Sequence, residues 1–298
     1  MSFRHRIENG MVRGTMGLLS LLSEKQRGAL GRFAARSYFR AGKSRRQIAL
    51  RNLAAAFPDW SEERVEATAE KCAENFGTVL FDFLAATRLS REQLLADVEM
   101  SGDEHYRASV RRGKGVFLLS AHFGNWEIGA LAAGLLARPI ASVVRPLDNP
   151  YLEAELESLR GKFSNRTIAK KRAAREILRE IRAGETVAIL IDQNVLAREA
   201  VFVPFFGRVA ATSPALALFQ LKTDAAVVPV FCRPLGDGRY RLGFEKPILL
   251  ADLPEPDRAV ESLTALYTRV TEGVVRAEPH LWLWMHNRWR TRPPAEGA

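Results

Sequence analysis

Residues 115–120 read Gly-Val-Phe-Leu-Leu-Ser, and residues 121–127 continue as Ala-His-Phe-Gly-Asn-Trp-Glu. The continuous apolar run predicts a strand that is buried on both faces, as strands of parallel sheets usually are. Gly124 permits a sharp turn after this strand, and a helical pattern of apolar residues follows from 126 to 137. A buried strand that turns directly into a helix indicates an α/β fold.

Strands and helices continue to alternate along the chain. Further strands are predicted at 140–144, 186–191, 226–232 and 240–245, with a Gly236-Asp237-Gly238 hairpin turn between the last two. Further helices are predicted at 61–86, 152–163, 170–183, 213–222 and 257–277. We therefore expect an α/β fold with a mixed central sheet flanked by helices.

The composition excludes several classes of protein. The chain has 298 residues, 47% of them hydrophobic, which is enough to bury a large core. Cys72 and Cys232 lie far apart, and there is no H-E-x-x-H motif, so neither a disulfide framework nor a metal site is expected. No apolar segment reaches the roughly 20 residues of a spanning helix, and residues 14–23 lack a following cleavage site. We expect a chain that is neither exported nor membrane-spanning.

The net charge of +10 comes from the N-terminal region, because residues 1–51 contain twelve Lys and Arg but only two acids. On a helical wheel one face is apolar and the opposite face is basic: Leu30, Phe33, Ala34, Tyr38 and Ala41 against Arg32, Arg36, Arg40 and Lys43. This pattern predicts a helix on an anionic membrane surface; a surface helix packed on its own domain is the alternative. Nucleic acid is not expected, because no recognition motif accompanies the charge.

The C-terminal region combines aromatic and basic residues in a similar way. Residues 282–289 contain three of the five tryptophans, with arginines beside them. Tryptophan next to arginine is typical of a membrane interface, and it also suits an acyl-chain pocket. A helix packed in the core is the alternative interpretation.

His122 and Glu127 are the first candidate catalytic residues. His122 follows the buried strand, and Glu127 falls in the first turn of the next helix, where the helix dipole favours a carboxylate. A glutamate on one imidazole nitrogen would fix the tautomer, so that the other nitrogen could accept a proton from a hydroxyl. The alternative is a glutamate that only caps its helix beside an incidental histidine.

Other polar residues are expected at the same edge of the sheet, since ligands bind beyond the carboxyl ends of strands. Asp192-Gln193-Asn194 follows the strand at 186–191, and Arg145 follows the strand at 140–144. Arg145 could hold a phosphate or a developing oxyanion, or could be an ordinary solvated arginine. Residues 162–182 are rich in Lys and Arg, which suits an acidic protein, phosphates or a solvated helix face.

Several of these motifs together resemble those of the bacterial lipid A late acyltransferases, of the lauroyl and myristoyl type. The similar segments occur in the expected order from about residue 40 to residue 292: Arg46–Leu53 with Phe57-Pro58, Ser120–Glu127, Arg145-Pro146 with Asp148-Asn149-Pro150, Asp192-Gln193, Phe202–Gly207 and Trp282–Trp289. The N-terminal region differs, because members of this family often begin with a more continuous hydrophobic anchor.

The resemblance implies a fold like that of the glycerolipid acyltransferases and an enzyme without cofactor or metal, at the cytoplasmic face of the inner membrane. Such enzymes transfer a fatty acyl chain from acyl carrier protein to a hydroxyl of an anionic glycolipid, the Kdo-bearing lipid A precursor. By the same resemblance His122 is the general base and Glu127 its partner. Supporting roles in binding substrate or the oxyanion fall to Arg145, Asp192, Gln193 and Asn125.

The domain division that follows is a basic, helical, membrane-facing arm at 1–50 and a catalytic domain at 51–298. Related enzymes acylate other glycolipids, such as mannosylated phosphatidylinositol, from acyl-CoA or acyl carrier protein, so the acceptor and donor stay open. A non-catalytic peripheral membrane protein is the alternative from a different class. His122→Ala would separate these classes, since only an enzyme would lose its function.

Overall fold

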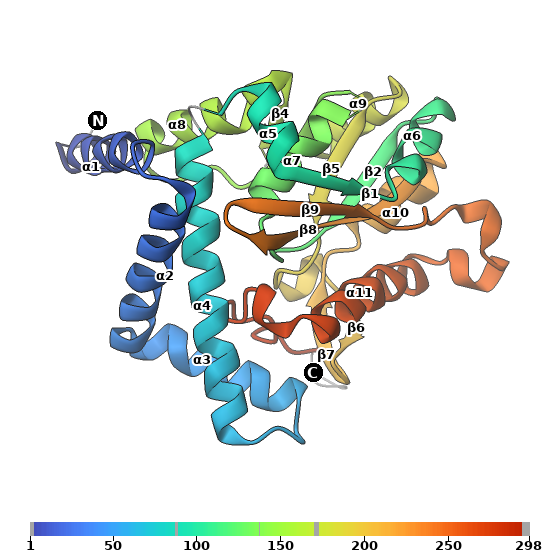
Figure 1. The fold of residues 1–298 in the computed structure, drawn as a ribbon. Helices are drawn as coiled ribbons and strands as arrows, with labels where there is room; N and C mark the ends of the chain where they lie inside the picture. The colour runs from blue at the N-terminus through green and yellow to red at the C-terminus, as the bar shows by residue number, and fades with distance from the viewer. Residues whose placement is uncertain (1–2, 87–88, 137, 170–172, 294–298) are drawn as a thin grey trace.

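A computed structural model of the chain describes residues 3–86, 89–136, 138–169 and 173–293. The central sheet has seven strands in the order β1-β9-β8-β2-β5-β3-β4 (Figure 1). The strands are β1 (Val98–Ser101), β2 (Val116–Ser120), β3 (Ile140–Val144), β4 (Arg166–Ala169), β5 (Thr186–Leu190), β8 (Ala226–Gly236) and β9 (Arg239–Phe244). β8, β2, β5, β3 and β4 are parallel, whereas β9 is antiparallel to β8 and parallel to β1. The predicted mixed α/β sheet is confirmed.

Helices cover both faces of this sheet (Figure 1). They are α1 (Phe3–Leu19), α2 (Glu24–Ala41), α3 (Lys43–Ala56), α4 (Glu62–Ala85), α5 (Arg91–Asp97), α6 (Asp103–Arg111), α7 (Trp126–Leu136), α8 (Pro150–Arg160), α9 (Ala173–Arg182), α10 (Ala215–Thr223) and α11 (Val260–Ala277). No helix among the described residues is long and apolar enough to cross a membrane.

The central strand β2 shows why two layers of helices are needed. Val116 and Leu118 pack on one face with α4 and α7, whereas Phe117 and Leu119 pack on the other face with α9, α10 and α11. All four side chains are buried, because side chains alternate between the two faces of a strand and both faces are covered. The continuous apolar run at 116–119 is the sequence signature of this arrangement.

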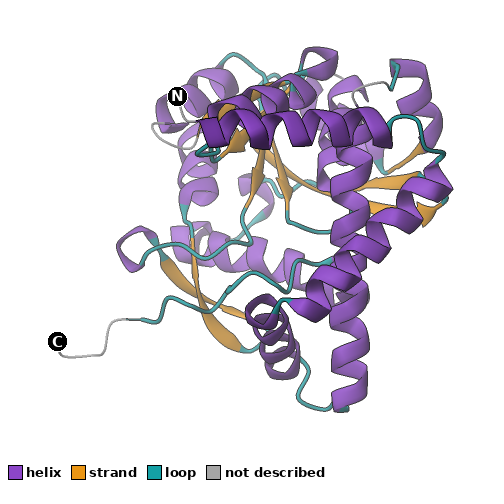
Figure 2. Ribbon diagram, turned by 90° about the vertical axis from the view of Figure 1, so that its left-hand side faces the viewer, coloured by secondary structure: helices purple, strands orange, loops and turns teal. Residues whose placement is uncertain are grey.

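A two-stranded hairpin lies apart from the main sheet. β6 (Val201–Phe205) and β7 (Arg208–Thr212) pair antiparallel, and Figure 2 shows them below the main sheet near the C-terminus. Phe205 and Phe206 belong to an apolar cluster together with α3, α4 and the tryptophans of the C-terminal segment. This cluster joins the two ends of the chain.

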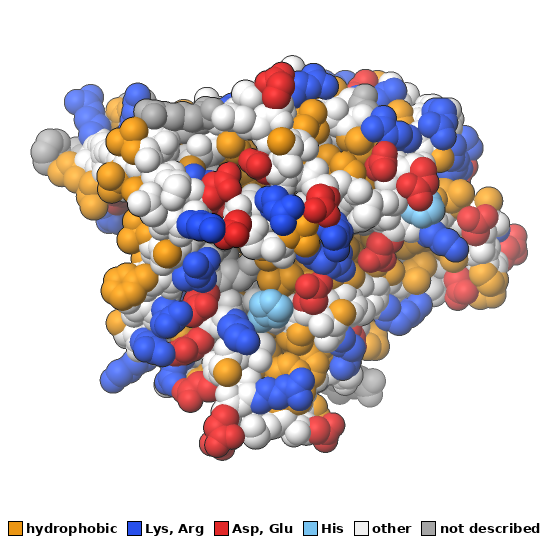
Figure 3. Space-filling view, viewed as in Figure 1, with side chains coloured by type: hydrophobic (Ala, Val, Ile, Leu, Met, Phe, Trp, Pro, Cys, Tyr) orange, Lys and Arg blue, Asp and Glu red, His pale blue; other side chains and the backbone are white. Residues whose placement is uncertain are grey.

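The N-terminal helices pack on α4 through small and charged residues. Gly31 of α2 and Gly77 of α4 lie so close that a Cβ atom at Gly77 would overlap the carbonyl oxygen of Gly31. Around this contact four arginines of α2 and α3 form ion pairs with acids of α4: Arg27–Asp82, Arg36–Glu74, Arg40–Glu70 and Arg46–Glu66. Basic and acidic side chains lie side by side on this part of the surface (Figure 3). Arg36 and Arg40 of the predicted basic face therefore meet this protein's own carboxylates.

The predicted helix boundaries differ from the structure at a few places. The helix expected at 152–163 begins at Pro150, because Asn149 caps it, and ends at Arg160. The chain then leaves helical geometry, with Phe163 at a φ of 59°. The helix expected from 257 begins at Val260, after a 3-10 turn. The first residues of the helix expected at 170–183, and position 137, lie outside the described residues.

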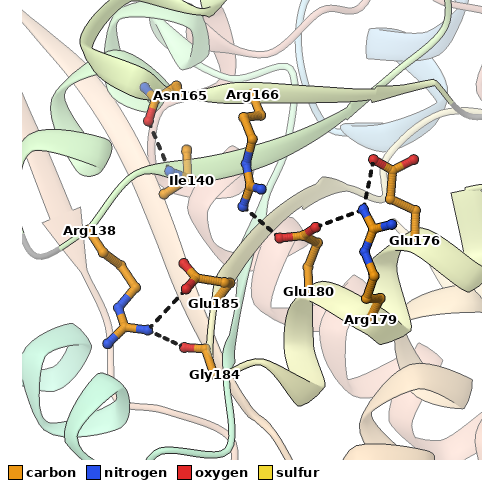
Figure 4. A network of polar contacts seen from close by, with 9 residues as sticks. All are labelled: Arg138, Ile140, Asn165, Arg166, Glu176, Arg179, Glu180, Gly184 and Glu185. Atoms are coloured by element: carbon orange, nitrogen blue, oxygen red, sulfur yellow. Dashed lines mark hydrogen bonds and ion pairs between the residues drawn. The ribbon is translucent and has the colours of Figure 1, made fainter.

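Two arginines of the basic segment 162–182 form ion pairs with neighbouring carboxylates (Figure 4). Arg166 and Arg179 both contact the buried Glu180, at 2.6 and 3.2 Å. Asn165 accepts a hydrogen bond from the Ile140 backbone N–H at 2.9 Å, which ties β4 to β3. Within the described part of this segment, Arg166 and Arg179 are thus engaged by the protein's own carboxylates.

Candidate active site

His122 lies just beyond the end of β2 and is held by Asp192, just beyond the end of the adjacent β5. The backbone N–H of His122 donates to Asp192 Oδ2 at 2.9 Å, and His122 Nδ1 lies 2.9 Å from Asp192 Oδ1. Because an ionised carboxylate only accepts hydrogen bonds, Nδ1 carries the proton and Nε2 keeps its lone pair. The amide nitrogen of Gln193 lies 3.1 Å from Nε2 and donates to it.

Asp192 and His122 shift each other's pKa in opposite directions. Burial opposes ionisation of Asp192, but the charge of His122 and hydrogen bonds from His122 and Trp282 outweigh it and lower its pKa to about 2. Burial also opposes protonation of His122, yet the Asp192 carboxylate and its hydrogen bond raise the pKa of the imidazole above its usual value. An imidazole with this pKa is a stronger base than a free histidine.

The predicted hydrogen bond between Glu127 and His122 is not formed. Glu127 instead accepts hydrogen bonds from Nη2 and Nε of Arg160, at 2.6 and 3.1 Å. The carboxylate that contacts the imidazole of His122 is that of Asp192. The cause is geometric: Glu127 lies in the first turn of α7 beside α8, where the planar guanidinium matches both carboxylate oxygens. The charge of Glu127 still contributes to raising the pKa of His122.

Asn125 also differs from its expected place. Its side chain is buried, and its Oδ1 accepts a hydrogen bond from the Ile128 backbone N–H, which caps the start of α7. It therefore holds the turn and is not among the residues that line the cavity beside His122. The same turn requires glycine at 124, where φ is 56° and a Cβ atom would overlap the carbonyl oxygen of Cys232.

A cavity of about 640 Å³ opens beside His122. Its polar end is formed by His122, Gln193, Glu127 and Arg160, and Arg145 is a further charged residue of the lining. Most of its remaining wall is apolar and comes from both layers of the fold: Leu118, Ala133, Ile140, Ile177, Leu216, Phe219 and Val230. Apolar walls with a few convergent polar groups at one end suit a ligand with a long chain and a reactive polar end.

Arg145 and the two cysteines are placed differently in relation to this cavity. Arg145 lies at the end of β3 as predicted, is exposed at the cavity's edge, and makes no ion pair with the described residues. Cys232 lines the cavity but is buried, and burial raises the pKa of its thiol. Burial likewise raises the pKa of the Cys72 thiol to about 12. Neither cysteine is poised as a nucleophile, since nucleophilic attack needs the thiolate.

Sequence reasoning missed three residues at the site. Arg160 lies in the helix predicted at 152–163 but was not singled out, and Trp282 and His286 belong to the segment assigned to a membrane interface, an acyl-chain pocket or a core helix. In the structure Trp282 Nε1 donates to Asp192 Oδ2 at 2.8 Å, and His286 Nε2 accepts from the Asn194 backbone N–H at 2.9 Å. Polar side chains inside an apolar segment were the available signal, because a buried polar group needs a partner.

The arrangement suits general-base chemistry: an Asp–His pair presents the unprotonated imidazole Nε2, beside the Gln193 amide, at the end of an apolar cavity. Comparison with known proteins gives the family. The profile of the family described as bacterial lipid A biosynthesis acyltransferase matches residues 2–291. The chain therefore belongs to this family and is an acyltransferase of lipid A biosynthesis.

Curated relatives agree with this assignment. The chain is 28% identical to the lipid A biosynthesis lauroyltransferase of Escherichia coli K12 over 84% of this chain and 81% of that protein. It is 28% identical to a lipid A biosynthesis acyltransferase of Haemophilus influenzae over 85% and 78%. It is 27% identical to the lipid A biosynthesis myristoyltransferase of E. coli K12 over 90% and 80%.

Among solved structures, the 1-acyl-sn-glycerophosphate acyltransferase PlsC of Thermotoga maritima aligns with a TM-score of 0.40. The sequence identity is 15%, over 83% of this chain and 97% of that one, which is too remote a likeness to bear on activity.

The curated relatives differ in the acyl chain that their names specify, so the family does not determine which acyl chain this protein transfers.

Proposed function

We propose that this protein transfers a fatty acyl chain from acyl carrier protein to a hydroxyl of a Kdo-bearing lipid A precursor, at the cytoplasmic face of the inner membrane. The observation that carries the proposal is the His122–Asp192 pair at the polar end of the apolar cavity. The chain length of the donor and the position of the acceptor hydroxyl are left to experiment.

In the proposed reaction, His122 Nε2 removes the proton from the acceptor hydroxyl, and the hydroxyl oxygen attacks the carbonyl carbon of the thioester. The Asp192 carboxylate stabilises the imidazolium that forms, and Arg145 supplies positive charge to the tetrahedral oxyanion. The C–S bond then breaks, the thiolate of the carrier leaves, and it takes the proton from Nε2. The Gln193 amide occupies the place at Nε2 that the acceptor hydroxyl takes.

Glu127 remains part of the proposed machinery in a different role. Its two oxygens hold the guanidinium of Arg160 at the polar end of the cavity, where it can meet an anionic group of a substrate. This role replaces the direct His–Glu hydrogen bond of the family-based prediction, and it assigns the orientation of His122 to Asp192.

Association with a membrane is supported by the apolar residues of α2. Every residue of the stripe predicted from the sequence is exposed: Leu30, Phe33, Ala34, Tyr38 and Ala41. On α1, Ile7, Met11 and Leu18 are exposed as well. A surface of this kind on basic N-terminal helices suits peripheral or monotopic binding to anionic lipid.

The same helices lead to the polar end of the cavity. The side chain of Asn149, which caps α8, donates to the backbone carbonyl of His5 at 3.2 Å and to Glu8 Oε2 at 2.9 Å. α8 ends at Arg160, so the helix whose cap contacts α1 leads to the polar end of the cavity. A membrane-bound acceptor would thus reach the site without leaving the interface.

The test is a transfer assay in vesicles that contain a Kdo-lipid A precursor, with acyl carrier proteins that bear chains of different lengths. We expect transfer by the wild type and a loss of about 10²–10⁴-fold in His122→Ala. Parallel assays with acyl-CoA donors and with other glycolipid acceptors test the alternative donor and the alternative acceptors. If folded wild type acts only on another acceptor, the acceptor proposed here is wrong; if His122→Ala keeps full activity, the mechanism is wrong.

A further inference from the structure

We infer that the C-terminal segment 282–291, here called the strap, positions the His122–Asp192 pair, with Trp282 as the residue that orients the Asp192 carboxylate. The inference rests on the proposed role of His122 as a base. Its starting point is that the tryptophans of this segment, which look membrane-bound in the sequence, are buried directly behind the site: Trp282, Trp284 and Trp289.

The strap is joined to the loop that carries His122 by backbone hydrogen bonds. The N–H of Leu283 donates to the carbonyl oxygen of His122 at 3.1 Å. Just before the strap, the carbonyl oxygen of Leu281 accepts from the N–H of Gly124 at 2.9 Å, and Phe123 and Trp282 form an antiparallel bridge. The backbone on both sides of the catalytic imidazole is therefore fixed by the strap.

The strap also holds the loop that carries Asp192. Besides the bond from Trp282 to Asp192, the side chains of Asn194 and Thr291 form a hydrogen bond at 3.0 Å, and the Thr291 N–H donates to Asn194 Oδ1 at 3.0 Å. Burial lowers the pKa of His286 to about 4, so its ring is neutral at physiological pH and its Nε2 can accept from the Asn194 N–H.

Side chains from the N-terminal helices hold the strap from behind. Asn52 of α3 donates to the carbonyl oxygens of Trp284 and His286, at 3.0 and 2.9 Å. Cys72 of α4 donates its S–H to the carbonyl oxygen of Trp282, with the sulfur 2.9 Å from that oxygen. The strap is thus fixed on two sides, and it transmits the packing of α3 and α4 to the site.

The two carboxylate oxygens of Asp192 accept hydrogen bonds from different donors, and this shows what Trp282 contributes. Oδ2 accepts from the His122 backbone and from Trp282 Nε1, which leaves Oδ1 for the imidazole. Without the indole N–H, Oδ2 keeps one donor, and the carboxylate is less firmly oriented and less neutralised. A less neutralised carboxylate stabilises the imidazolium more strongly, so the pKa of His122 rises.

The decisive variant is Trp282→Phe, which keeps an aromatic ring but removes the N–H. We expect kcat to fall by about ten- to a hundredfold, since a hydrogen bond to a charged group is lost. KM for the acyl donor should stay within about twofold, because binding does not involve Asp192. The acidic limb of the pH profile should move to higher pH.

Trp284→Phe is the matched control. Trp284 lies two residues away, is equally buried, and also donates its indole N–H, but to the carbonyl oxygen of Pro279 at 2.7 Å. This variant should lose thermal stability to a similar extent and leave the pH profile unchanged. If both variants shift the profile equally, or if Trp282→Phe shifts nothing, the positioning role is wrong.

A second readout does not depend on the transfer reaction. The pKa of His122 can be measured by NMR titration of the imidazole without substrate, in wild type and in both variants. We expect it to rise in Trp282→Phe only. If the wild type transfers no acyl chain but this shift occurs, the proposed function fails and the strap inference stands; if transfer occurs without the shift, the reverse holds.

Discussion

Two segments of similar composition differ in their exposure to solvent in this structure. The stripe on α2 and the C-terminal segment both place aromatic residues beside arginines, and both suggested contact with a membrane. Phe33 and Tyr38 are 69% and 68% exposed, whereas Trp282 and Trp284 are 1% and 0% exposed. Such a pattern shows that two faces of a segment differ in polarity, but it does not show which face turns inward.

The partners of the polar groups decide the difference. On α2 the buried residues are Gly28, Gly31 and Phe39, and the glycines permit close approach to α4. Arg36 and Arg40 stay partly exposed beside this contact and pair with acids on α4, so the apolar stripe faces outward. In the C-terminal segment Arg288 is buried and donates to the carbonyl oxygen of Ala211 at 2.6 Å. The indole N–H groups of Trp282 and Trp284 also find internal acceptors, so their aromatic rings can be buried with them.

The largest expected effect concerns the stability of the buried segment. Trp284→Ala should lower the free energy of unfolding by about 3–5 kcal/mol, because it leaves a large cavity in the core. Denaturant unfolding measures this change. The same truncation at Phe33 should change the unfolding free energy by less than about 0.5 kcal/mol. Equal costs at the two positions would remove the contrast between the segments.

The exposed stripe should matter for lipid binding instead. Phe33→Ser should weaken binding to anionic vesicles by about tenfold or more, because burying a phenyl ring in the interface contributes about 1.5–3 kcal/mol. Cosedimentation with vesicles measures the dissociation constant. Leu196→Ser is the control, since Leu196 is also exposed but lies outside the N-terminal helices. Equal weakening in both variants would argue against a specific membrane face.

The buried Asp192–His122 pair should make the free energy of unfolding depend on pH in a characteristic way. The pKa of Asp192 is lowered to about 2, so its stabilising contribution is present above its unfolded pKa and is lost as the pH falls toward 2. The pKa of His122 is raised, so its contribution is present below pH ~6.5 and is lost as the pH rises through its folded pKa. The pair therefore stabilises most between about pH 4 and 6.5.

Unfolding measured from pH 3 to 9 in wild type and Asp192→Asn checks this window. The difference in unfolding free energy between the two proteins should be largest inside the window and shrink on both sides. A difference that is constant across this range would show that Asp192 acts through packing alone.

The smallest effect is expected for the ion pairs under the exposed stripe. Arg36 and Glu74 are both partly exposed to solvent, and solvent screens such a pair. Arg36→Gln should change the unfolding free energy by less than about 1 kcal/mol, and added salt should reduce the change further. A cost as large as that of Trp284→Ala would show that α2 is attached mainly through charge.

The sequence predicted the regular parts of the fold well. The apolar runs of β2, β3 and β5 and the helices between them follow from local periodicity. The meeting of His122 and Asp192 could also be anticipated, because adjacent parallel strands end at the same edge of a sheet. For that reason Asp192 was identified as a site residue although it lies 70 positions from His122.

The side-chain pairing within the site could not be predicted in the same way. Glu127 lies near His122 in the sequence, but Arg160 offers it two donors, and only the packing of α8 against α7 brings them together. The contacts of Trp282 and His286 depend on a segment about 90 residues from the loop it holds. Local patterns carry no information about such distant choices.

The strap has a consequence for synthesis on the ribosome. Asn52 and Trp284 are 232 positions apart, so at roughly 5–20 residues per second the strap is made roughly 10–50 seconds after the helix that anchors it. For most of that interval α1 and α2 are outside the ribosome while the strap is still missing. If these helices bind lipid as proposed, the nascent chain can do so before its catalytic pair is assembled.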